Sequence, residues 1–164
     1  MRTYRLILSG LGNVGRSFLE VIQSQSDLLA SRYGIALIVT GVADSGGAAI
    51  DPSGLDVAAL IATKRAGQSV TSLAGVGAPG MSAVELARQA PGDALLESTL
   101  TNIRDGQPGL DVIRAALNRG IAVVSANKGP LWWHMLSWPR SPRDPAGLDC
   151  ALVHVSAATS QASI

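Results

Sequence analysis

Apolar positions recur at two different periods along the chain up to about residue 125, and the change of period predicts strands and helices in turn. A short apolar strand is expected at 4–9, followed by a glycine-rich turn and by a helix from Arg16 onward, whose apolar residues recur at helical spacing. The run 35–43 lacks polar alternation, which is typical of a parallel strand covered on both faces. Together these segments predict one β-α-β unit.

The same alternation continues after this unit. Three helices are expected: 55–63, 82–88 with Ser82 as its cap, and 109–118 with Gly120 as its stop. Two strands are expected: 94–99 and 121–125. The glycine- and proline-containing segments 44–54 and 68–81 are expected to be loops. Strands that alternate with helices imply an α/β fold, in which a doubly wound parallel sheet has right-handed connections.

The pattern changes abruptly after Leu131. All three tryptophans, both histidines and three closely spaced prolines follow it, and the run 132–149 has no apolar period. We therefore expect one domain over 1–131 and a divergent tail over 132–164, with a further strand at 150–155. Two explanations stay open for 132–149: an out-of-frame or divergent segment in a chain that stops early, or a genuine loop rich in tryptophan and proline.

Composition narrows the classes of protein. A chain of 164 residues with 47% hydrophobic and 15% charged residues suits one globular domain. The formal charge of +1 comes from scattered basic residues, so neither nucleic acid nor a membrane is expected as a partner. Cys150 is alone, His134 and His154 have no ligand spacing, and no leader pattern opens the chain. We therefore expect a cytoplasmic protein without a metal.

The glycine turn after the first strand carries the first chemical signal. Gly10, Gly12 and Gly15 match the G-x-G-x-x-G pattern between a strand and a helix. The first glycine permits the sharp turn, the second lets a pyrophosphate approach the backbone, and the third packs the helix on the strand. A Rossmann-type dinucleotide-binding domain is therefore predicted, with a purely structural turn as the alternative.

Asp44 ends the second predicted strand, where a carboxylate can accept hydrogen bonds from the adenosine ribose. A turn-forming aspartate is the alternative interpretation, because Asp-Ser-Gly-Gly suits a turn. No basic residue follows immediately to pair with a 2′-phosphate, which favours NAD over NADP. Lys64 or Arg65 folding back to the site would restore NADP.

Three later segments are similar to motifs of one enzyme family. They are 97–102, 106–108 and 125–131, and the last contains the string Ala-Asn-Lys-Gly-Pro-Leu, which is more specific than the glycine turn. With that turn they follow in the order and spacing found in homoserine dehydrogenases, across about four-fifths of the chain. The chain thus resembles the cofactor domain of a homoserine dehydrogenase.

The resemblance implies NAD(P)-dependent interconversion of aspartate semialdehyde and homoserine, on the branch toward threonine and methionine. It also implies a small-molecule substrate and, for full-length relatives, a homodimer. The residues that the resemblance places at the cofactor are Gly10, Gly12, Asn13, Val14, Gly15, Thr99, Thr101, Asn102, Ser125, Ala126, Asn127 and Lys128.

Lys128 is the expected catalytic residue. It follows the carboxyl end of a predicted parallel strand, where ligands collect in doubly wound sheets. An ammonium group there would orient the substrate oxygen, relay a proton or stabilise an alkoxide. A solvated loop lysine is the alternative, and the family resemblance favours the site.

Family members continue into a second domain that closes over the substrate, and this chain does not show it. Two functions therefore stay open: the cofactor domain of a homoserine dehydrogenase, or a module that binds nicotinamide nucleotide without turnover. A different Rossmann dehydrogenase is a third alternative, because a fold alone never determines function.

Overall fold

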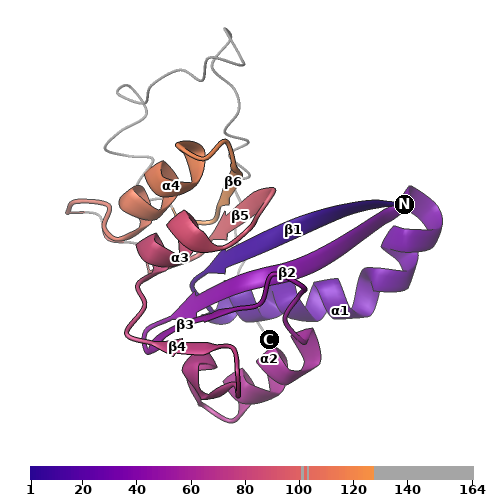
Figure 1. Cartoon of the computed structure of the whole chain (residues 1–164), viewed down its shortest axis with the longest axis horizontal. Helices are drawn as coiled ribbons and strands as arrows, with labels where there is room; N and C mark the ends of the chain where they lie inside the picture. The colour runs from indigo at the N-terminus through magenta and orange to yellow at the C-terminus, as the bar shows by residue number, and fades with distance from the viewer. Residues whose placement is uncertain (101, 103, 128–164) are drawn as a thin grey trace, which may run out of the picture.

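The computed structural model describes residues 1–100, 102 and 104–127. Within them one six-stranded sheet has helices on both faces (Figure 1). The strands are β1 (Arg2–Ser9), β2 (Ile35–Asp44), β3 (Gly47–Ile50), β4 (Gly77–Pro79), β5 (Ala94–Glu97) and β6 (Ala122–Ser125). The helices are α1 (Asn13–Tyr33), α2 (Val57–Arg65), α3 (Ala83–Gln89) and α4 (Gly109–Leu117), with a 3-10 turn at Val70–Ser72.

The central strands are parallel and form the doubly wound part of the fold. The sheet order is β4-β3-β2-β1-β5-β6, and β2, β1, β5 and β6 run in the same direction. Along β1, Leu8 packs with the core beneath α1 and α2, whereas its neighbour Ile7 packs with α3 and α4 on the opposite face. The expected α/β class is therefore confirmed.

Two antiparallel edge strands were not expected. The segments 44–54 and 68–81, expected to be loops, contain β3 and β4, which pair antiparallel with each other and, through β3, with β2. A β-carbon on Gly47 would lie 2.6 Å from the Ala78 carbonyl oxygen, and one on Gly77 would lie 2.2 Å from that of Thr71. The glycines that suggested loops instead allow backbones to approach closely at the sheet edge.

The remaining elements follow the sequence pattern closely. Ser82 caps α3, and its side chain and that of Glu85 form a reciprocal capping box. Helix α1 starts at Asn13 rather than Arg16, because its first turn lies within the glycine motif. Strand β5 ends at Glu97, two residues before the expected end.

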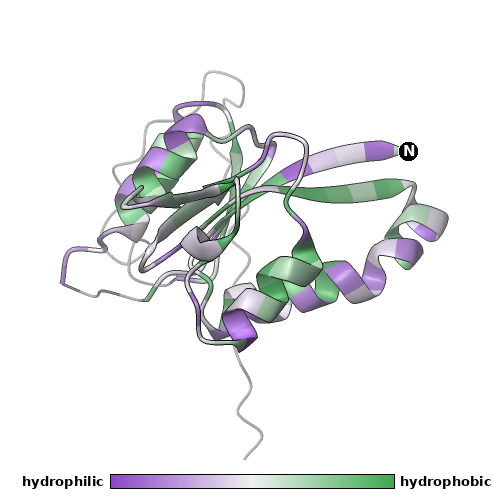
Figure 2. Ribbon diagram, turned by 60° about the horizontal axis from the view of Figure 1, so that its bottom comes forward, coloured by the Kyte–Doolittle hydropathy of each residue, from purple (hydrophilic) through white to green (hydrophobic). Residues whose placement is uncertain are grey.

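The sheet is longest at β1 and β2, which project with α1 beyond the other strands (Figure 1). For this reason the first part of β2 is only half-buried, whereas 39–43 is buried as expected. Helix α1 carries bands of polar and apolar residues, as Figure 2 shows. Its buried residues Leu19 and Ile22 pack under the sheet.

Several expectations lie outside the described residues. They are the roles of Thr101 and Lys128, the domain boundary at 131, the tail 132–164 with its segment 132–149, and the strand at 150–155. Within the described part, none of the helices has the length and hydropathy needed to cross a membrane.

Candidate functional site

The carboxyl ends of the four parallel strands meet at one edge of the sheet, and the predicted site residues gather there. Three loops extend the pairing past the strand ends: Gly10 N donates to Ala43 O (3.0 Å), Ser98 N to Ser9 O (2.8 Å) and Ala126 N to Glu97 O (2.8 Å). These bonds hold the loops after β1, β5 and β6 side by side. Ligands of doubly wound sheets bind at this edge.

Each glycine of the turn has the surroundings that the motif predicts for it: a tight turn at the first, open space at the second and close helix packing at the third. Gly10 has a φ of +92°, and a β-carbon there would lie 2.7 Å from backbone atoms of Ser98 and Thr99. A β-carbon on Gly15 would lie 2.2 Å from the Gly10 carbonyl oxygen, so only glycine lets α1 pack this closely. Apart from Gly12 itself and its two chain neighbours, no described residue has an atom within 4 Å of a β-carbon built on Gly12. Open space over Gly12 is what close approach of a ligand requires.

The N-terminus of α1 faces this open space without a cap from the described side chains. Gly12 is the N-cap residue, and the first turn contains no acidic residue. The Asn13 side-chain oxygen instead accepts a hydrogen bond from Arg16 Nη2 (2.7 Å), and the Val14 side chain is 45% exposed. The first N–H groups of a helix carry partial positive charge, so this terminus suits an anionic group.

A second set of predicted residues meets at the ends of β5 and β6. The side-chain amide of Asn127 donates to Thr99 Oγ1 (3.2 Å), and the backbone N–H of Asn127 donates to Ser125 Oγ (3.2 Å). Thr99 and Ser125 are joined through Glu97: one carboxylate oxygen accepts from Thr99 N (3.0 Å) and from the Thr99 hydroxyl, and the other accepts from Ser125 Oγ (3.2 Å). Glu97 thus organises the cluster, although the sequence analysis did not select it.

Asn102 and Ala126 follow β5 and β6 and make different contacts. The Asn102 side-chain oxygen accepts from Arg104 N (2.9 Å), which closes the turn that leads to α4. Ala126 contributes its backbone, through the bond to Glu97 O. Asn102 therefore shapes the neighbouring loop, and Ala126 holds the end of β6 against that of β5.

Asp44 lies at the end of β2 as expected, but its carboxylate is already bonded. It accepts from Lys64 Nζ (2.7 Å), Ser69 Oγ (2.8 Å), Val70 N (3.0 Å) and Gly46 N (2.9 Å), and 6% of its side chain is exposed. Burial alone would raise the pKa of Asp44, but the hydrogen bond from Lys64 and the three others together hold it below its ordinary value.

The contacts of Asp44 can be compared with its two interpretations, as a ribose acceptor and as a turn-forming aspartate. The bond from Gly46 N is the side-chain turn that the Asp-Ser-Gly-Gly pattern favours. Lys64 folds back to the end of β2, as the sequence analysis allowed. Because the lysine holds the carboxylate, the acceptor expected for a ribose is engaged within the protein.

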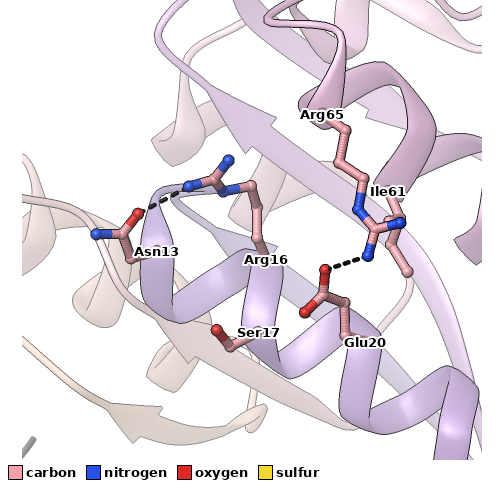
Figure 3. A pocket seen from close by; sticks show the side chains of 6 residues that line it. All are labelled: Asn13, Arg16, Ser17, Glu20, Ile61 and Arg65. Atoms are coloured by element: carbon pink, nitrogen blue, oxygen red, sulfur yellow. Dashed lines mark hydrogen bonds and ion pairs between the residues drawn. The ribbon is translucent and has the colours of Figure 1, made fainter.

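A cavity of about 300 Å³ lies between the first turns of α1 and the last turn of α2 (Figure 3). Its lining residues are Asn13, Arg16, Ser17, Glu20, Ile61 and Arg65. Arg65 forms an exposed ion pair with Glu20 (2.8 Å). The cavity thus presents two guanidinium groups, from Arg16 and Arg65, beside the helix terminus that suits an anion. Among the described residues, no group of histidine, cysteine and carboxylate side chains is arranged to hold a metal.

Comparison with known proteins finds two enzymes of similar sequence. No family model matches the chain. It is 31% identical over 135 residues to an NAD(+)-dependent homoserine dehydrogenase of Pseudomonas canavaninivorans, and 31% identical over 126 residues to a homoserine dehydrogenase of Methanocaldococcus jannaschii. Over most of its own length the chain is thus similar in sequence to homoserine dehydrogenases. The matches cover 82% and 77% of it, but only 38% and 37% of the two relatives.

Solved homoserine dehydrogenases share the fold. The enzyme of Thermoplasma acidophilum matches with a TM-score of 0.65 and 28% identity, over 81% of this chain and 38% of that one. A hyperthermophilic archaeal homoserine dehydrogenase, solved in complex with NADPH, matches with a TM-score of 0.64 and 22% identity, over 79% and 37%. The Rossmann-like sheet described above is therefore shared with these enzymes, and the chain spans little more than a third of their length.

Proposed function

We propose that this chain binds a nicotinamide dinucleotide across the carboxyl edge of its parallel strands, with the pyrophosphate at the N-terminus of α1. The observation that carries the proposal is the glycine turn. The space over Gly12 is open, the α1 terminus has no cap from the described side chains, and no acidic residue lies in its first turn. A pyrophosphate fits such a site because it is anionic and accepts backbone N–H bonds.

The two sides of the glycine turn suit the two halves of a dinucleotide. On the β2 side lie Asp44 and the cavity between α1 and α2, whose polar and basic residues suit the adenosine half. On the β5 and β6 side lie Thr99, Ser125 and Asn127. We assign the nicotinamide half to this second side, in line with the family resemblance.

We further propose that the reaction of the whole enzyme is NAD(P)-dependent interconversion of aspartate semialdehyde and homoserine. Both sequence relatives are named as homoserine dehydrogenases, one of them as NAD(+)-dependent. Bound nicotinamide supplies the hydride donor and acceptor of such a reaction. The chain's own part is to hold that ring at Thr99 and Asn127, and Lys128, by resemblance, is the residue that contacts the substrate oxygen.

The choice between NAD and NADP is the finer part of the proposal. The preference for NAD in the sequence analysis depended on the absence of a basic residue directly after Asp44. Lys64 stands beside Asp44 in the fold, and Arg16 and Arg65 line the adjoining cavity. Because these cations could pair with the 2′-phosphate of NADP, the sequence argument for NAD no longer holds, and either cofactor suits the site.

A direct binding measurement tests the proposal. Isothermal titration calorimetry of the 164-residue chain with NAD, NADP and ADP-ribose should give saturable binding with one ligand per chain. If none of the three binds, the proposal is wrong. An assay of NAD(P)H formation with homoserine then separates two functions: turnover supports the dehydrogenase, and binding without turnover supports a nucleotide-binding module.

A further inference from the structure

Buried polar side chains are concentrated at one end of the sheet. In the described part of the chain, buried polar or charged residues other than Thr40 all lie at the ends of β1, β5 and β6 or directly after them: Ser9, Glu97, Ser125 and Asn127. Burial of polar groups costs free energy unless they are well paired. Departures of this kind from an apolar interior are expected at functional sites.

Glu97 is the central member of this set. In the parallel register it is the partner of Ser9 on β1 and of Ser125 on β6, so the three side chains point to the same face of the sheet. The Glu97 side chain is fully buried. The hydroxyl of Ser9 is also buried, and it has no hydrogen-bond partner among the described residues. The strand position next to Glu97 therefore holds a buried hydroxyl group that takes part in none of the described hydrogen bonds.

The hydrogen bonds of Glu97 in the described part of the chain are all with neutral groups. Its oxygens accept from the Thr99 backbone N–H, the Thr99 hydroxyl and the Ser125 hydroxyl. No ion pair joins it to a lysine or arginine within the described part of the chain. An ionised Glu97 would thus have only neutral donors among the described residues, and one of them, Thr99, is half-buried at the edge of the sheet.

We propose that Glu97 is ionised and that its buried charge makes this site favour the oxidised nicotinamide ring over the reduced one. The inference rests on the proposed function, which assigns the nicotinamide half to Thr99 and Asn127. The oxidised ring carries one positive charge, and the reduced ring is neutral after accepting a hydride. A negative charge in a poorly solvated site attracts the first and not the second, and salt screens such an interaction little.

The hydrogen-bond geometry allows this charge to be removed without breaking the network. The Ser125 hydroxyl has one hydrogen and two acceptors in reach, Glu97 Oε2 (3.2 Å) and Asn127 O (3.1 Å). In E97Q the new amide would donate to Ser125 Oγ, which would donate to Asn127 O, while the remaining oxygen would still accept from Thr99. E97Q therefore changes the charge and keeps the bonds.

The test measures dissociation constants of the full chain for NAD+, NADH and ADP-ribose by calorimetry. In E97Q the ratio of the NADH constant to the NAD+ constant should fall by about tenfold, as expected for loss of one nearby charge at an intermediate effective dielectric. Binding of ADP-ribose, which lacks the nicotinamide ring, should be unchanged. D111N is the matched control, because it removes an exposed carboxylate from α4. Its ratio should stay within about twofold of the wild-type ratio, since water and salt screen that charge.

An unchanged ratio in E97Q would overturn the proposal. Equal weakening of NAD+ and NADH would also overturn it, because Glu97 would then only position its neighbours. If E97Q does not fold, E97D and E97N form a second pair that differs only in charge. A higher ratio in E97D than in E97N supports the proposal, and equal ratios reject it. A wild-type chain that binds neither ADP-ribose nor NAD+ would instead refute the proposed function itself.

Discussion

The ammonium group of Lys64 lies 2.7 Å from Asp44 Oδ2, and the two side chains are 16% and 6% exposed. This ion pair joins the last turn of α2 to the end of β2, the strand that leads to the adenosine side of the proposed site. A carboxylate at this position favours ribose hydroxyls, whereas a cation favours a 2′-phosphate. If the cofactor binds as proposed, this pair would decide which of the two charges its adenosine half meets.

Removal of the lysine should change the cofactor preference. In K64M the Asp44 carboxylate would keep its three neutral donors but lose its cation, so its charge would repel a 2′-phosphate. The ratio of the NADP dissociation constant to the NAD constant should therefore rise about tenfold or more. The free energy of unfolding should fall by about 3 kcal/mol, because one partner of a mostly buried pair stays behind. Titration calorimetry and urea unfolding measure the two effects. K64R is the control that keeps the charge, and a ratio in K64M equal to that in K64R would contradict the prediction.

Asp44 should also make the fold sensitive to acid. Its folded pKa is lowered, since the bonds from Lys64 and the other donors outweigh burial, so its contribution to stability is present above the unfolded pKa of about 3.9 and is lost as the pH falls through the folded value. The measurement is urea unfolding at several pH values between about 6 and 3. D44N should be less stable than the wild type near neutral pH, but should lose less stability over this range.

Asp93 provides the comparison for this experiment. The hydrogen bonds from Arg5 lower its pKa too, but 36% of the Asp93 side chain and 48% of the Arg5 side chain are exposed. Exposed pairs contribute little to stability. D93N should therefore follow the wild-type pH profile closely, and a D44N profile parallel to both would show that Asp44 does not carry the effect.

The cap of α3 is a local feature that was predicted from sequence. Ser82 accepts from Glu85 N (3.2 Å), and the Ser82 N–H donates to the Glu85 carboxylate (2.8 Å). S82A should lower the free energy of unfolding by about 1 kcal/mol, as loss of an N-cap does. S26A, a change at an exposed serine within α1 that bonds only its own helix, should have an effect near zero. Equal effects of the two substitutions would mean that the cap does not stabilise α3.

Local signals of this kind explain which parts of the fold could be predicted. The parallel strands and their helices follow from apolar periods and caps, such as Leu19 and Ile22 in α1 and Ser82 before α3. Strands β3 and β4 are only four and three residues long and contain Gly47 and Gly77, so they lack any period. Their pairing depends on backbones that approach closely in three dimensions, which a linear pattern does not show.

Some residues of the candidate site could likewise be named from the sequence, and others could not. The glycine turn could be predicted because its motif is local, and the residues after β5 and β6 were named through the family resemblance. Glu97 was missed, because a single acidic residue at the end of an apolar strand gives no signal until the register places it between Ser9 and Ser125. Arg16 was missed because its relation to the cavity depends on how α2 packs beside α1.

Two glycines of the same motif should separate cofactor binding from folding. Beyond its chain neighbours, a β-carbon on Gly12 would meet no described residue within 4 Å, and the φ of −71° lies outside the left-handed region that favours glycine. G12A should therefore keep the wild-type unfolding midpoint in urea, while its added methyl group occupies the space assigned to the pyrophosphate. Dinucleotide affinity should fall by at least about tenfold, because a close backbone approach is blocked.

Gly15 is the matched counterpart. A β-carbon there would lie 2.2 Å from the Gly10 carbonyl oxygen, so α1 would have to move away from the strand. G15A should lower the free energy of unfolding by about 2 kcal/mol or more, in the range of overpacked core substitutions. Calorimetry with ADP-ribose and urea unfolding on both variants test the pair. If G12A binds ADP-ribose as tightly as the wild type, the ligand does not approach the turn at Gly12, and the pyrophosphate must be placed elsewhere along the edge.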